Sequence, residues 1–334
     1  MKPIYRNLFL LFGVVSIVVM ACTFNVDWNQ LWTNMGRVGM YMPAVIGVWV
    51  AVYACNAAAF QLIINHGHTQ RLLPYHLAYK LTVSGFAFSY TTPFGFGGAP
   101  YRVMELSGYI GTNRAMSSVV LYSMMHILSH FCLWATAALL YIAFYKVQPF
   151  MWTFILLFFA VFVVAVYFFY KGYKNGLVVK FVTVMAKVPL LKKYVSKFYE
   201  KNKENLKQID EQIAYLHKQG KAFYTALFYE YIARVINSFE YLFILWALAP
   251  QAGATFLDAL MILALSSLLG NLLFFFPMQL GVREGSLSLI IKMLFPTMST
   301  SIGLLTSFYT RIRELFWIFV GVMLVKMANK KNLE

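Results

Sequence analysis

Residues 91–100 read Thr91-Thr92-Pro93-Phe94-Gly95-Phe96-Gly97-Gly98-Ala99-Pro100, and they interrupt an apolar stretch of the chain. The apolar residues before this break (77–90) and after it (101–110) are each too short to cross a bilayer, which takes about 20 residues. Proline and glycine oppose a continuous helix, because proline lacks a backbone N–H and glycine is the most flexible residue. We therefore predict a re-entrant hairpin, whose irregular backbone is tolerated at membrane depth only where protein or a water-filled cavity surrounds it.

A second break of the same kind lies further along the chain, at Pro277-Met278-Gln279-Leu280-Gly281-Val282-Arg283-Glu284-Gly285. Apolar residues 255–276 precede it, and a short apolar piece at 286–295 follows it. When Pro277 is aligned with Pro93, Gly281 matches Gly97, four residues after the proline in each case. The match indicates an internal repeat, with a first copy at about residues 40–145 and a second at about residues 222–328.

The other apolar stretches are long enough to span a membrane completely. We predict about six of them, at residues 8–24, 40–64, 115–145, 150–170, 222–249 and 302–325. The composition agrees, because 60% of the 334 residues are hydrophobic and only 12% are charged, against about 25% in soluble domains. Such a chain has too little polar surface to stay in water, which excludes a soluble enzyme, a nucleic-acid-binding domain and a disordered chain.

The distribution of positive charge predicts the orientation. Residues 171–221 contain twelve lysines and four acidic residues, which together supply half of the net charge of +16. Loops rich in Lys and Arg stay in the cytoplasm, so counting spans from this segment puts both termini on the cytoplasmic side of the cell's inner membrane. Apolar residues at helical spacing in the same segment are typical of an interfacial helix, and its lysines favour an anionic lipid surface over nucleic acid as a partner.

With this orientation the first hairpin enters from the cytoplasmic side and the second from the outer side, so the two repeats are inverted. The expected fold class is an all-α polytopic membrane protein that forms one domain over residues 1–334. It combines about six full spans with two re-entrant or broken helical hairpins in an inverted repeat. Broken helices at matching positions of two inverted halves point to the substrate site of a transporter.

Charged residues recur inside the predicted membrane segments, where each costs at least about 2.5–3.5 kcal/mol at mid-depth. The residues expected to bind substrate include two glycines that let a head group approach the backbone, and the full set is Gly97, Gly98, Arg102, Glu105, Glu230, Arg234, Arg283, Glu284, Arg311 and Glu314. One interpretation of the charges is a set of salt bridges that hold helices together. The other is a polar cavity in which arginines bind a phosphate through bidentate hydrogen bonds while the acids neutralise them when the site is empty.

Two spans carry further polar residues at helical spacing. Residues 222–249 contain a polar stripe made of Glu230, Arg234, Asn237 and Tyr241, with Glu240 beside it. On residues 115–145, His126 and His130 are one turn apart, a spacing that can bind a metal. Because no third ligand is evident, we favour a polar contact within the bundle and expect neither a metal nor a cofactor.

The N-terminal residues loosely match a lipoprotein signal that ends at Ala21-Cys22, preceded by Lys2, Arg6 and an apolar run. Met20 fits the cleavage motif poorly, and many more spans follow. We therefore expect a retained first helix rather than lipidation of Cys22.

Three motifs together resemble the lysylphosphatidylglycerol synthase transmembrane-region family, also known as the flippase-like domain family. They are Thr91-Thr92-Pro93 with Gly97-Gly98-Ala99-Pro100, Pro277 with Gly281-Val282-Arg283-Glu284-Gly285, and Tyr309-Thr310-Arg311 ahead of Gly321. The resemblance covers about residues 8–328. Of the residues expected to bind substrate, it extends to Gly97, Gly98, Arg283, Glu284 and Arg311.

In the fused members of that family, this domain moves aminoacylated phosphatidylglycerol between leaflets, and a soluble C-terminal domain makes that lipid. Here the sequence ends at Glu334, directly after the last span, so the resemblance implies translocation rather than aminoacyl transfer. Two residues depart from the family pattern. Gln279 stands where the family often has glycine, and Ala99 stands where some members have a polar or acidic residue.

The function that we expect is flippase-like translocation of a phospholipid or a polyprenyl-phosphate-linked lipid between leaflets, through a polar cavity at the membrane midplane. The alternative is a membrane-embedded transferase acting on a lipid-linked substrate, which needs a general base or a metal. The available side chains for that chemistry are Glu105, Glu230, Glu284, His126 and His130. A scaffold subunit is a third hypothesis, and the sequence leaves a homo-oligomer open.

Overall fold

The structure is a computed structural model, and in the parts that it describes every regular element is a helix. These parts are residues 28–65, 73–90, 92, 95, 97–147, 149–175, 177–185, 195–197, 199–200, 203–204, 206–208, 210–211, 214, 220–273, 279, 281–299 and 301–331. The predicted first span at 8–24, Cys22 and the break prolines Pro93 and Pro277 lie outside the described residues.

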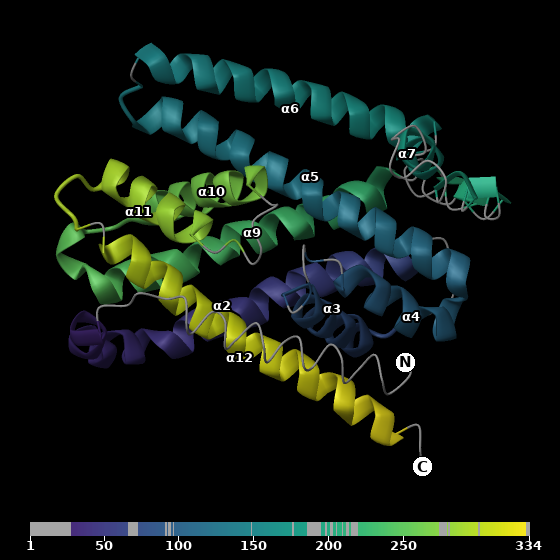
Figure 1. Cartoon of the computed structure of the whole chain (residues 1–334), viewed down its shortest axis with the longest axis horizontal. Coiled ribbons are helices and arrows are strands. Elements are labelled where there is room, and N and C mark those ends of the chain that lie inside the picture. The colour runs from purple at the N-terminus through teal and green to yellow at the C-terminus, as the bar shows by residue number, and fades with distance from the viewer. Residues whose placement is uncertain are drawn as a thin grey trace.

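The helices follow the predicted apolar stretches closely (Figure 1). In chain order they are α2 (Trp28–Asn65), α3 (Tyr75–Tyr90), α4 (Gly98–Ile110), α5 (Thr112–Phe144), α6 (Pro149–Asn175), α7 (Leu177–Met185), α9 (Gly220–Leu248), the short 3-10 helix η2 (Pro250–Ala252), α10 (Phe256–Leu272), α11 (Val282–Leu294) and α12 (Ser301–Lys331). Both predicted hairpins are present as pairs of shorter helices, α3 with α4 and α10 with α11.

The helix ends differ from the predicted span ends in two places. Helix α2 begins at Trp28, twelve residues before the predicted span, since hydropathy detects immersion in lipid whereas helix formation continues into polar sequence. Between α4 and α5 a single residue, Gly111, forms the connection. Its φ of 79° lies in the left-handed region that glycine adopts without a steric cost, so the chain can reverse there.

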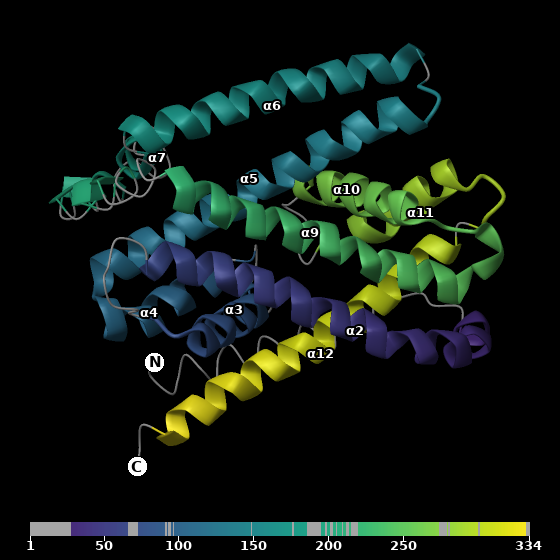
Figure 2. The same ribbon diagram turned by 180° about the vertical axis from the view of Figure 1, so that it is seen from behind.

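The long helices α2, α5, α9 and α12 form the body of the molecule, and the two hairpins lie at opposite ends of its long axis (Figures 1 and 2). Helix α2 packs most extensively on α9. The C-terminal end of α12 and helix α7 lie at the same end as the α3–α4 hairpin. Helix α6 lies on the outside, against α5.

Contacts among the first four helices have counterparts among the last four. Each of the pairs α2–α3, α3–α4, α4–α5 and α2–α5 has an equivalent in α9–α10, α10–α11, α11–α12 and α9–α12. The contacts between the halves match in the same way, since α3 packs on α12 as α10 packs on α5, and α9 packs on α5 as α2 packs on α12. Two hydrophobic cores accompany this arrangement, one centred on Phe60, Tyr101 and Met125 and the other on Leu245, Ile262 and Leu287.

The outer surface is that of a membrane protein. Among the described residues, three helices are long and apolar enough to cross a bilayer, over Val38–Asn65, Thr112–Phe144 and Gly220–Leu248. Helix α6 exposes a series of apolar side chains that includes Leu156, Leu157, Val163 and Val164, which suits contact with lipid. The chain is therefore a multi-pass helical membrane protein.

Candidate functional site

A cavity of about 450 Å³ lies at the centre of the described helices, and both chain breaks open onto it. The residues beside the breaks that line it are Tyr90, Gly95 and Ala99 in the first hairpin, and Asn271, Gln279 and Arg283 in the second. At about 30 Å³ of liquid volume per water, the space is equivalent to about fifteen waters. It is large enough for a polar head group.

Four arginines line this cavity, and no aspartate or glutamate in the described part of the chain does so. They are Arg102 on α4, Arg234 on α9, Arg283 on α11 and Arg313 on α12. Four buried glutamates, Glu230, Glu240, Glu284 and Glu314, lie behind the wall and not on it. Because the positive groups face the space, the cavity suits an anion.

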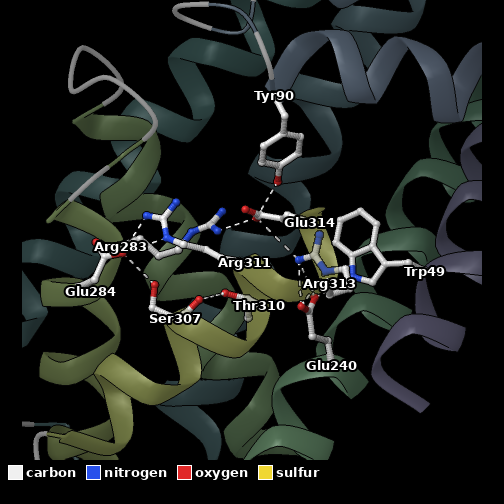
Figure 3. A network of polar contacts seen from close by, with 10 residues as sticks. All are labelled: Trp49, Tyr90, Glu240, Arg283, Glu284, Ser307, Thr310, Arg311, Arg313 and Glu314. Atoms are coloured by element: carbon white, nitrogen blue, oxygen red, sulfur yellow. Dashed lines mark hydrogen bonds and ion pairs between the residues drawn. The ribbon is translucent and has the colours of Figure 1, made fainter. Parts of the chain in front are cut away.

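A group of ion pairs, which we name the ion-pair network, joins α9, α11 and α12 beside the cavity (Figure 3). Arg283 pairs with Glu314, Arg311 lies 2.7 Å from Glu284, and Arg313 lies 2.9 Å from Glu240. All six side chains are mostly buried, with exposures of 19% or less. Buried charges of this kind are stable only when paired and hydrogen-bonded, as they are here.

Neutral side chains from α2 and α3 extend the ion-pair network. The Tyr90 hydroxyl donates to Glu314 at 2.9 Å, and the Trp49 indole N–H donates to Glu240 at 2.7 Å. The guanidinium carbon of Arg313 lies 3.8 Å from the centre of the Trp49 ring, a cation–π contact. The network thereby connects five helices, α2, α3, α9, α11 and α12.

Glu284 has a second role at the start of α11. One of its carboxylate oxygens accepts a 2.7 Å hydrogen bond from the backbone N–H of Gly281, while the other accepts from Ser307 and Arg311. Gly281 has a φ of 79°, so the backbone at the second break needs glycine here. The negative side chain also lies where the partial positive charge of a helix N-terminus is found.

A second polar group, which we name the histidine cluster, joins α2, α5 and α9. Its members are Asn56, Tyr122, His126, Ser129, Glu230 and Arg234. The Nδ1 atom of His126 lies 2.8 Å from the carboxylate of Glu230, and the amide of Asn56 lies 3.4 Å from the same carboxylate. Arg234 donates instead to the Ser129 hydroxyl at 2.7 Å and to the His126 carbonyl at 3.1 Å.

The structure separates the residues expected to bind substrate into three groups. Arg102, Arg234 and Arg283 line the cavity. Glu230, Glu284, Arg311 and Glu314 lie behind its wall as partners of other side chains. Glu105 lies on α4, away from the cavity, and the two glycines pack against α3.

Gly97 and Gly98 permit the close approach of α4 to α3. A Cβ on Gly97 would lie 2.7 Å from the carbonyl oxygen of Phe88, and one on Gly98 would collide with Ser89 and Gly85. The Gly97 N–H also donates to the Thr92 hydroxyl at 2.7 Å. Their expected contact with a head group stays a prediction, since the contacts that the structure describes are with α3.

Several cavity residues were not among those expected to bind substrate. Trp49, Tyr53 and Asn56 of α2 line the cavity, as do His126, His130 and Arg313. Asn56 carries the clearest sequence signal, because an amide within an apolar span seeks a partner. In the predicted polar stripe on α9, Arg234, Asn237 and Tyr241 line the cavity and Glu230 bonds His126.

The histidine pair lies with its rings 5.6 Å apart between centroids. Within the described ranges, no group of three or more His, Cys, Asp or Glu side chains is arranged to hold a metal. The carboxylate of Glu230 is an acceptor, so the His126 Nδ1 atom that contacts it is the protonated one.

Two pairs of short helices that meet at an arginine-lined cavity define the general class, a multi-pass helical membrane domain with a polar interior. The family model described as the lysylphosphatidylglycerol synthase TM region matches residues 9–321. The chain therefore belongs to this family, as the motifs at the two breaks predicted. No curated protein and no solved structure matches the chain.

Proposed function

We propose that the protein translocates a phosphate-bearing lipid between the two leaflets of the membrane, with the head group passing through the central cavity. The observation that carries the proposal is the set of four arginines around a space of about 450 Å³ that has no acidic side chain on its described wall. Guanidinium groups bind phosphate oxygens through paired, charge-assisted hydrogen bonds. Membership of a lipid-related membrane family agrees with this ligand.

One helix end strengthens the attraction for an anion. The N-terminal end of α4 lies at the first break, next to residues that line the cavity, whereas the end of α11 is already occupied by the Glu284 carboxylate. A helix N-terminus has unsatisfied N–H groups and a partial positive charge, which favour phosphate. Six residues of the cavity wall also have buried polar atoms without a partner, namely Tyr53, Asn56, Arg102, His130, Asn237 and Arg313. Such atoms cost about 1–3 kcal/mol each, because they are buried and lack a hydrogen bond.

The proposed architecture is one domain with two inverted halves, α2–α5 and α9–α12. Support comes from the matched helix contacts and from the two hairpins at opposite ends of the molecule. In this proposal the end with α7 and the C-terminus of α12 faces the cytoplasm, where the lysines of residues 171–221 meet anionic lipid. Movement of one half against the other would open the cavity to each leaflet in turn.

The test is leaflet exchange in vesicles that contain the purified full chain. Lipids with a labelled head group, including phosphatidylglycerol, phosphatidylethanolamine and a polyprenyl phosphate, are compared with diacylglycerol, which has no phosphate. We expect protein-dependent exchange of at least one phosphate-bearing lipid at a rate well above that of vesicles containing heat-denatured protein. Folded protein that exchanges none of them would contradict the proposal.

A membrane-embedded transferase is the second candidate, and one contact favours it. Glu230 orients His126 at 2.8 Å, and His126 exposes 35% of its side chain on the cavity wall. A carboxylate that orients an imidazole is the arrangement of a general base. Mass spectrometry of the lipids after the exchange assay separates the two functions, because a translocator returns its lipid unchanged whereas a transferase alters its mass.

A further inference from the structure

The four arginines of the cavity wall differ in what neutralises them. Arg283 and Arg313 each contact a carboxylate, from Glu314 and Glu240. For Arg102 and Arg234, no carboxylate in the described parts of the chain lies within 4.0 Å of the guanidinium. Arginine stays protonated in proteins, so these two groups cannot become neutral.

Arg102 is held in place by groups that leave its charge uncompensated. It is 8% exposed, and its guanidinium carbon lies 5.2 Å from the centre of the Tyr122 ring. A Cβ on Gly85 would lie 2.5 Å from its Nε atom, so glycine there lets the guanidinium lie against α3. One Nη atom is 3.5 Å from the Thr82 carbonyl oxygen, and the buried Nε atom has no partner.

Arg234 is likewise fixed by neutral acceptors, the Ser129 hydroxyl and the His126 carbonyl. Glu230, one helical turn earlier, is turned toward His126 and Asn56. The two arginines flank the same turn of α5, because Arg102 lies over Tyr122 and Arg234 bonds the backbone of His126. The rings of Tyr122 and His126 are 6.1 Å apart between centroids.

We propose that Arg102 and Arg234 form the phosphate subsite of the cavity, and that its ligand is a lipid phosphodiester with a single negative charge. When His126 and His130 are neutral, the two positive charges of Arg102 and Arg234 and the negative charge of Glu230 add up to one net positive charge. A phosphodiester has one negative charge and balances it, whereas a phosphomonoester with two negative charges exceeds it. The assignment of the phosphodiester to a transported lipid rests on the proposed function. Arg283 and Arg313 then shape the cavity wall without binding the phosphate, since their charges are already matched.

The experiment measures binding rather than transport, on the purified full chain in detergent by native mass spectrometry. The probes are phosphatidylglycerol, phosphatidic acid and diacylglycerol with the same acyl chains, with inorganic phosphate as a competitor. The variants are Arg102→Gln and Arg234→Gln, and the matched control is Arg114→Gln. Arg114 lies on α5 outside the cavity wall and donates to the Ile64 carbonyl.

We expect Arg102→Gln and Arg234→Gln each to raise the Kd for phosphatidylglycerol about tenfold or more, the effect of losing a charge-assisted hydrogen bond. Arg114→Gln should leave that Kd unchanged, and no variant should alter the weak binding of diacylglycerol. Arg283→Gln should weaken binding less than either subsite variant. If Arg102→Gln does not fold, Arg102→Lys keeps the charge but loses the planar donor pair, and should still weaken binding.

Wild-type affinity for phosphatidylglycerol in both subsite variants would overturn the subsite. Tighter binding of phosphatidic acid than of phosphatidylglycerol would overturn the inference that the ligand carries a single negative charge. Displacement of phosphatidylglycerol by an equal concentration of inorganic phosphate would overturn the inference that the ligand is a lipid. Binding that depends on Arg102 without any leaflet exchange would refute the proposed function alone. Exchange by wild type with unchanged binding in the variants would refute the subsite alone.

Discussion

The ion-pair network and the histidine cluster lie on the same cavity and contain the same types of residue, but they distribute charge differently. In the ion-pair network each arginine contacts a glutamate on another helix. In the histidine cluster the glutamate contacts a histidine, and Arg234 contacts neutral oxygens. The comparison teaches that the charges of the first group are matched without a ligand, whereas the second retains positive charge for one.

The largest effect should follow from breaking a buried pair of the ion-pair network. Glu240→Ala leaves Arg313 and the Trp49 indole without their acceptor in a site where both glutamate and arginine are at most 4% exposed. We expect a loss of about 3–5 kcal/mol of stability, measured by thermal or denaturant unfolding in detergent. Glu105→Ala is the control, since Glu105 has no ion pair among the described residues. An equal loss of stability in this control would show that the effect does not come from breaking an ion pair.

A double-mutant cycle on Arg311 and Glu284 should show the next largest effect. Each single change to Gln breaks a 2.7 Å contact, and the double change removes both charges together. We expect a coupling energy of about 1–3 kcal/mol from unfolding of the four proteins. A coupling near zero would show that Glu284 stabilises the protein through the Gly281 N–H and the Ser307 hydroxyl rather than through Arg311.

A change on the first hairpin should disturb the histidine cluster side of the cavity. Gly98→Ala places a Cβ against Ser89 and the Gly85 carbonyl, which displaces α4 and the Arg102 that it carries. We expect a loss of about 1–3 kcal/mol together with weaker phosphatidylglycerol binding. Gly285→Ala is the matched change on α11, where nothing lies within 4 Å of the new Cβ, and it should leave stability unchanged or slightly raised.

The smallest effect should come from Trp49→Phe. The change removes the 2.7 Å hydrogen bond to Glu240 but keeps an aromatic ring beneath Arg313. We expect a loss of about 0.5–1.5 kcal/mol, because Arg313 still neutralises the carboxylate. Unfolding in detergent checks this value, and a loss as large as that of Glu240→Ala would mean that the indole, not the arginine, is the essential partner.

Much of the fold could be predicted from the sequence because membrane segments depend on local composition. The two breaks and the polar stripe of α9 are properties of spacing along the chain, and hydropathy located the long helices to within a few residues at most ends. The early start of α2 was missed because polar residues 28–37 form a helix without being apolar.

The partners of the charged residues could not be predicted in the same way. Arg311 and Glu314 are three residues apart on α12, a spacing that favours contact within one helix, yet Arg311 binds Glu284 and Glu314 binds Arg283. Arg102 lies against Gly85 and Tyr122. Helix spacing identifies neighbours within one helix, whereas these partners come from other helices whose relative positions are set by packing.

The matched contacts of the two halves have a consequence for how the protein could be made. Helix α6 packs mainly on α5, and the principal contacts between the halves come from α2, α3, α5, α9, α10 and α12. Because these contacts lie within the helices, we expect the cavity walls to align without covalent continuity through residues 186–219. Two separately expressed polypeptides, ending and restarting within that segment, should assemble into the same structure, so that a single reading frame could be replaced by a pair of genes.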